Sequence, residues 1–139
     1  MKSNDSGRSD LSTHFLNVDL DIYSKSDLQP MVTALGTGVD VLYFGPNGKG
    51  HCAHLEICKR TKGADATIRE FCRILKAIPE PARELWNAAS VRSFSIGVQA
   101  GKHPNPCDFK IDGETLKAVA SLSAEIVITV YPVPAGATD

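Results

Sequence analysis

Two stretches of the chain share one pattern: an alternating strand, an amphipathic helix and a second strand. They cover residues 15–44 and 94–131. Alternation of apolar and polar residues predicts a half-buried strand, and apolar residues three and four apart predict a helix. The pattern constrains the fold because each helix must bury its apolar side on the sheet that its flanking strands join. The two stretches match in periodicity and hardly in identity, so duplication and chance similarity both stay open.

The elements between these stretches complete the predicted fold. Residues 39–44 and 52–58 flank a Gly-, Pro- and Asn-rich turn, which is typical of a hairpin. A helix is expected after Asp65, and a short one over 82–89. The order predicts an α+β fold: a ferredoxin-like βαββαβ core extended by a C-terminal αβ unit. Its sheet is expected to be mainly antiparallel, with the helices largely on one face.

The alternation also predicts which side chains of the two opening strands face the core. They are Leu16, Val18, Leu20, Ile22, Phe94, Ile96 and Val98. Ser26 and Asp112 precede the two helices, where a side-chain oxygen can cap the first free N–H groups.

The last strand, 124–131, is apolar on both faces, and we expect it to be covered on both sides. A second subunit that meets this strand, together with Val41 and Tyr43, could provide part of the cover. The sequence therefore leaves a homodimer open.

The 139 residues suit one domain. We expect it to span 13–132, between a disordered polar segment, 1–12, and a flexible tail, 133–139. A formal net charge of -1 argues against nucleic acid and against an anionic membrane surface as partners. No signal peptide or membrane-spanning apolar run is visible, so the four cysteines are expected to be reduced in the cytoplasm.

Polar residues are predicted to gather on one face of the sheet. Side chains alternate along a strand, so Cys52, His54 and Glu56 should share a face, to which the first strand adds Asp19 and Asp21. His54, Glu56 and Asp19 could bind a metal such as zinc, manganese or iron, or a His beside a carboxylate could act as a general base. The sequence favours a simpler interpretation, the solvated outer face of an antiparallel sheet.

The loop over 101–108 is the longest irregular segment and offers a second candidate binding region. Lys102, His103 and Cys107 lie in it. Long loops on rigid scaffolds often bind ligands, and nearby cations can activate a thiol. A connection without a special role fits the same residues. No cofactor is expected, since the Gly-rich run 45–50 lacks the ending of a phosphate-binding loop and reads as a hairpin turn.

The stretch 94–131 reads FSIGVQAG, then CDFKID, TLKAVASLSA and EIVITVY. This succession resembles the C-terminal half of a bacterial family catalogued as domain of unknown function 4279. Residues 15–36 are also similar, and the resemblance spans most of 15–131. It implies a compact α+β domain and offers no catalytic residue to carry over.

These observations favour a non-catalytic binding or interaction module over an enzyme. Its partner would be a protein or a small ligand, and bacterial immunity proteins are one class of such modules, by fold-level analogy. The alternative is a metal-dependent or acid–base enzyme that uses the open sheet face through Asp19, Asp21, His54 and Glu56.

Overall fold

One sheet of five strands forms the centre of the computed structural model, which describes residues 12–135. The predicted segment 1–12 and tail 133–139 lie largely outside the described residues. The strands are β1 (His14–Ser24), β2 (Val39–Asn47), β3 (Gly50–Ile57), β4 (Val91–Gln99) and β5 (Glu125–Tyr131). Their order is β2-β3-β1-β4-β5, and only the β4–β5 pair is parallel. The prediction of an α+β fold with a mainly antiparallel sheet is confirmed.

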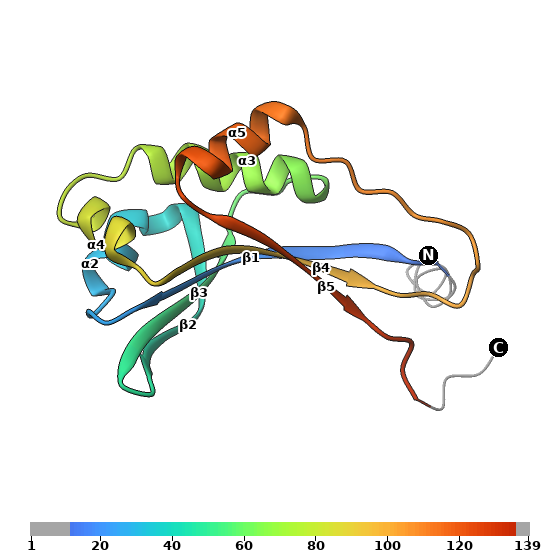
Figure 1. Cartoon of the computed structure of the whole chain (residues 1–139), viewed down its shortest axis with the longest axis horizontal. Coiled ribbons are helices and arrows are strands. Elements are labelled where there is room, and N and C mark those ends of the chain that lie inside the picture. Colours follow the sequence, from blue (N-terminus) through green and yellow to red (C-terminus); the bar gives the residue numbers. More distant parts are fainter. Residues whose placement is uncertain (1–11, 136–139) are drawn as a thin grey trace.

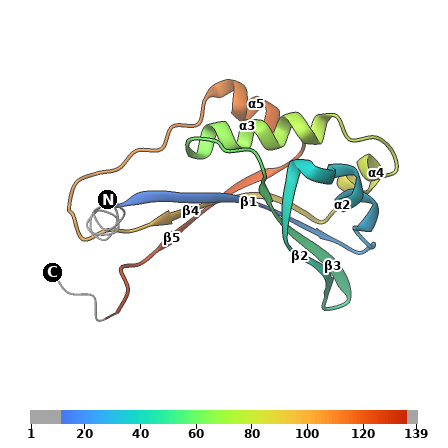
Figure 2. The same cartoon turned by 180° about the vertical axis from the view of Figure 1, so that it is seen from behind.

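Within residues 12–135, four α-helices lie largely on one side of this sheet, as Figures 1 and 2 show from opposite directions. They are α2 (Gln29–Leu35), α3 (Gly63–Lys76), α4 (Ala82–Ala88) and α5 (Gly113–Ser121). A 3-10 turn, η1 (Gly36–Gly38), follows α2, and Gly36 has a positive φ of 57° that a residue with a side chain rarely adopts. The opposite side of the sheet carries no helix in the described part of the chain.

The core lies between the helices and the sheet, where alternation predicted it. Leu20 and Ile22 of β1 are fully buried, and Phe71 of α3 packs with its ring centroid 5.6 Å from that of Phe94. Trp86 of α4 is 1% exposed, and its Nε1 donates a hydrogen bond to the Leu122 carbonyl at 2.9 Å. Burial of such large side chains supplies the main driving force for folding.

Leu16 is a correction to the predicted core. The register between β1 and β4 shifts between Phe15 and Asn17, which leaves Leu16 as the extra residue, 45% exposed. A bulge of this kind reverses the alternation on its far side. Phe15 therefore packs against the core in its place, beside Phe109 at a ring distance of 6.5 Å.

The predicted caps are also wrong in detail. Ser26 lies before the start of α2 and donates its backbone N–H to Ser24 Oγ at 3.0 Å. Asp112 does occupy the N-cap position of α5, but its carboxylate accepts from Arg69 of α3 at 3.3 Å. Asp65, inside the first turn of α3, accepts the Asp112 N–H at 3.0 Å. For Asp112, the packing of α5 against α3 supplies the alternative partners and overrides the local capping preference.

The last strand is not covered on both sides, contrary to prediction. Ile128 is 64% exposed and Val130 is 57% exposed. The nine-residue α5 contacts α3, and only Ala124 and Ile126 at the start of the strand pack against the core. The helix is too short to cover the rest of β5.

The two β-α-β stretches are joined into the sheet differently. In the first, β3 lies between β1 and β2, whereas in the second β4 and β5 are direct neighbours. The complete sheet is therefore mixed and five-stranded, and as a whole it departs from a four-stranded antiparallel ferredoxin-like sheet.

Candidate functional site

Side chains from β1, β3 and β4 meet on the helix-free side of the sheet, which we call the open face. Asp21 pairs with His54 of β3 on one side and with Ser93 of β4 on the other. Directly opposite residues of paired strands share a face, so the register places these polar side chains together. The structure thus brings Asp19, Asp21, His54 and Glu56 to one face, as the alternation predicted.

Asp21 is the centre of one hydrogen-bonded group. Its Oδ1 lies 2.6 Å from His54 Nδ1, and its Oδ2 accepts from Ser95 Oγ at 3.0 Å. The side chains of His54 and Asp21 are 30% and 21% exposed. The rings of Tyr23 and Tyr43 flank the imidazole at 5.7 and 6.2 Å. His54 is thus held by a carboxylate and two aromatic rings while its side chain stays partly exposed.

A second group joins Asp19 and Glu56. Asn17 Nδ2 donates to Asp19 Oδ1 at 3.0 Å and to Glu56 Oε2 at 2.8 Å. Burial, followed by repulsion from Glu56 and Asp21, raises the pKa of Asp19 from 3.8 to about 6. Attraction to His54 acts in the opposite direction and lowers this pKa, but does not offset the other causes. The open face therefore concentrates more negative charge than its own residues neutralise.

The metal alternative finds no support in the geometry. Within residues 12–135, no group of three or more His, Cys, Asp or Glu side chains is arranged to hold a metal ion. Cys52 also belongs to the open face by register, opposite Tyr23, but it is only 3% exposed. Burial raises the pKa of its thiol, which makes it a poor nucleophile or ligand.

The candidate loop forms a separate hollow of about 160 Å³. His103 and Cys107 line it, together with Thr13 at the start of the described chain. Lys102 is not among its lining residues. The loop and the open face are therefore two separate regions of the surface. The sequence pattern did not indicate where the loop lies relative to the open face.

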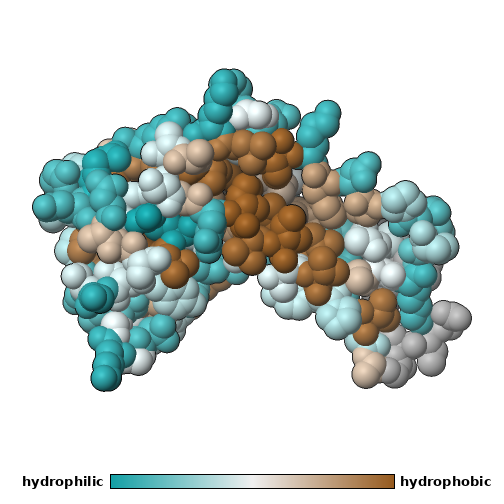
Figure 3. Space-filling model, in the orientation of Figure 1, coloured by the Kyte–Doolittle hydropathy of each residue, from teal (hydrophilic) through white to brown (hydrophobic). Residues whose placement is uncertain are grey.

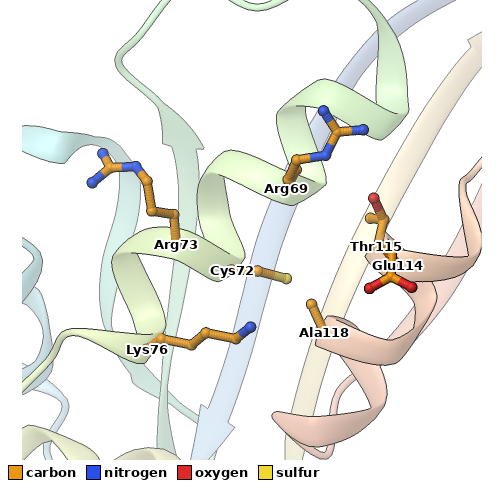
Figure 4. Close-up of a pocket in the computed structure, with 7 residues that line it drawn as sticks. All are labelled: Arg69, Cys72, Arg73, Lys76, Glu114, Thr115 and Ala118. Carbon is orange, nitrogen blue, oxygen red and sulfur yellow. The ribbon is translucent and has the colours of Figure 1, made fainter.

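A larger hollow between α3 and α5, of about 500 Å³, was not predicted. Its lining includes Arg69, Cys72, Arg73, Lys76, Glu114 and Thr115 (Figure 4). Basic residues at spacings of four and three along α3 are the sequence signal that could have found it. Arg73 is already paired with Glu70 at 2.6 Å and points away from the hollow, and Arg69 is paired with Asp65 and Asp112. These ion pairs make the hollow a weaker candidate than the open face.

No family model, curated protein or solved structure matches the chain. The resemblance based on residues 15–131 therefore stays a prediction. No helix within residues 12–135 is long and apolar enough to span a membrane.

Proposed function

We propose that the protein is a non-catalytic binding module that presents its open face to a cationic region of a partner protein. The observation that carries this proposal is the raised pKa of Asp19. Three carboxylates, those of Asp19, Asp21 and Glu56, lie close enough to affect one another, and the charged state is unfavourable in the free protein. A lysine or arginine side chain from a partner would relieve that repulsion and replace the lost solvation.

The internal hydrogen bonds favour binding over catalysis. Both oxygens of Asp21 are occupied, by His54 and by Ser95. Asn17 holds Asp19 and Glu56 together. A preorganised, rigid acidic surface suits recognition, because a partner does not have to order these side chains on binding. An immunity-like role, in which a basic partner is held by an acidic face, is consistent with this arrangement.

Capture from a cell lysate by immobilised protein tests the proposal. The Asp19→Asn, Glu56→Gln double variant removes two charges from the open face, and the Asp108→Asn, Glu114→Gln variant removes two from exposed sites elsewhere. The wild type and the control variant should retain the same basic proteins, which the open-face variant loses. Retention should weaken when the pH falls from 7 to 5, since Asp19 becomes protonated through its pKa of about 6.

The proposal fails if the open-face variant retains the same proteins as the wild type. It also fails if the retained proteins are not enriched in basic ones, or if salt does not release them.

The second candidate function is an acid–base enzyme. The short contact between Asp21 Oδ1 and His54 Nδ1, 2.6 Å, would orient the imidazole as a general base, and the pKa of Asp19 near 6 suits proton transfer at neutral pH. Turnover of ester or phosphoester substrates that is lost in His54→Gln, and kept in a His103→Gln control, would favour it. Equal turnover in the two variants would exclude His54 as the base.

We also propose that β1–β4 with α2 and α3 form a ferredoxin-like core, to which α5 and β5 are added. The position of β1 between β3 and β4, antiparallel to both, supports this assignment. Membership of the family of domain of unknown function 4279 and a cytoplasmic location belong to the same proposal. The free state of all four cysteines is consistent with a reducing compartment.

A further inference from the structure

The outer edge of β5 carries an apolar patch that is exposed to solvent in the monomer. The patch continues from α5 onto β5 and is visible as the brown area in the centre of Figure 3. The large exposed apolar side chains of α5 and β5 are Leu116, Val127, Ile128, Val130 and Tyr131. By register, Ile128 and Val130 lie on the helix side of the edge with Ile126, and Val127 and Tyr131 lie on the open-face side. Parallel strands are normally covered on both faces, so this degree of exposure is unusual for a strand like β5.

The backbone along this edge is ready to pair with another strand. The Tyr131 carbonyl accepts from the Ala100 N–H at 2.9 Å, on the side of β4. The backbone N–H and C=O groups of successive residues point to opposite sides of a strand. Those of Ile126, Ile128 and Val130 therefore point away from β4, toward the outer edge. Residues 126–131 contain no charge and no proline, which are the usual means of blocking an edge.

We propose that the partner at this edge is a second copy of the chain, whose β5 pairs antiparallel with the first about a twofold axis at Ile128. A strand edge is self-complementary under such an axis, since the same surface meets itself. Residues 1–11 and 136–139 offer only Met1 and Leu11 as large apolar side chains, a poor composition for covering the patch.

The charges favour this register. With Ile128 opposite itself, Ile126 faces Val130, so aliphatic side chains meet on one face of the joined sheet. On the other face Val127 meets Thr129. Glu125 is the only charged residue of β5. It would face Tyr131 of the other copy, and the two Glu125 residues would lie about 20 Å apart, six strand intervals. No like charges therefore face each other across the β5–β5 interface.

The area of the patch is also sufficient. Summed over α5 and both faces of the β5 edge, the five exposed side chains offer on the order of 400–500 Å² of largely apolar surface, within the range of the largest apolar patches on monomers, which are often functional. A stable interface buries about 800 Å² on each partner, of which somewhat more than half is apolar. The patch and the backbone edge beside it therefore supply the apolar share of such an interface and its main-chain hydrogen bonds.

Measurement of molar mass by light scattering after size exclusion tests the dimer. The wild type should have twice the 14.9 kDa of one chain, and Ile128→Lys should have the mass of a monomer. Leu42→Lys is the matched control, because Leu42 is 52% exposed on β2 at the opposite edge of the sheet, and it should remain a dimer. A monomeric wild type at 100 μM, or dissociation by Leu42→Lys, would overturn the proposal.

Disulfide trapping tests the register without disturbing the fold. In a Cys58→Ser, Cys107→Ser background, which removes the exposed thiols, Ile128→Cys should form a covalent dimer on mild oxidation. Paired residues at the twofold axis have Cα atoms about 5.5 Å apart, within the range that a disulfide spans. Leu42→Cys in the same background should stay uncrosslinked. Absence of the Ile128→Cys dimer would refute this pairing even if the wild type is dimeric through another surface.

Discussion

The strands β1 and β5 flank the same neighbour, β4, yet their environments are opposite. β1 is paired along both edges, and its apolar residues from Val18 to Ile22 are at most 2% exposed. β5 is paired along one edge, and Ile128, Val130 and Tyr131 are about half exposed or more. The more apolar of the two strands is therefore the more exposed. Strand composition alone does not decide burial, because burial also requires neighbours on the edges and faces.

The polar residues of β1 also depend on the neighbouring strands. Asp19 and Asp21 alternate with buried residues and find partners on β3 and β4. These partners exist only because β1 is central. β5 lies at the edge of the sheet, so its side chains can find partners on one neighbouring strand only, β4.

The largest expected effect on stability comes from truncating a core-facing side chain of β1. Leu20→Ala should lower the free energy of unfolding by about 3–4 kcal/mol, since Leu20 is fully buried and its truncation leaves a cavity. The matched change in β5, Ile128→Ala, should cost less than about 1 kcal/mol in the monomer. Urea denaturation under monomeric conditions measures both. Similar losses for the two variants would mean that β5 is buried after all.

An intermediate effect is expected on the open face. Asp21→Ala leaves His54 Nδ1 and Ser95 Oγ without their shared acceptor and should cost about 1–2 kcal/mol, because the site is only partly exposed. Asp108→Ala, in an exposed loop, should change the unfolding free energy by no more than about 0.5 kcal/mol. Equal effects in urea denaturation would show that the Asp21 contacts add no stability.

The smallest expected effect is an increase in the free energy of unfolding, where the two changes above lower it. Folding raises the pKa of Asp19 from 3.8 to about 6, so this group stabilises the fold below pH 3.8 and loses that contribution as the pH rises through 6. Asp19→Asn removes the titration and can still bond to Glu56. We expect a gain on the order of 1 kcal/mol at pH 7, after allowance for solvent screening. At pH 4 most of the gain should disappear.

Urea denaturation of Asp19→Asn and the wild type at pH 4, 5, 6 and 7 measures this difference. Asp108→Asn serves as the control, with no pH-dependent gain expected. A loss of stability at pH 7 in Asp19→Asn would contradict the raised pKa.

Much of the fold was predictable because local patterns have strong physical causes. The hairpin of β2 and β3 follows from a turn in which Gly48 has a positive φ, and the buried face of α3 follows from its helical spacing. The bulge at Leu16 was not predictable, since it depends on the register against β4. The capping error at Asp112 has the same origin, in contacts between α3 and α5 that are distant in sequence, whereas Ser26 simply lies too far before α2 and bonds locally to Ser24.

The candidate site was predictable only to the level of a shared face. Alternation placed His54 with Glu56, and the adjacency of β1 added the two aspartates. The partners of each group, and the raised pKa of Asp19, depend on side-chain positions across three strands. The hollow between α3 and α5 depends likewise on how two helices pack.

The sequence by itself determined which residues form strands and helices and which side of each element is apolar, because these follow from period and propensity within a few residues. Only the tertiary structure decided that β3 would separate β1 from β2 while β5 would lie at an edge. The two β-α-β stretches are similar as sequences and differ in the sheet because pairing depends on which distant strand occupies the adjacent position. That choice leaves the apolar residues of β5 available for a second copy.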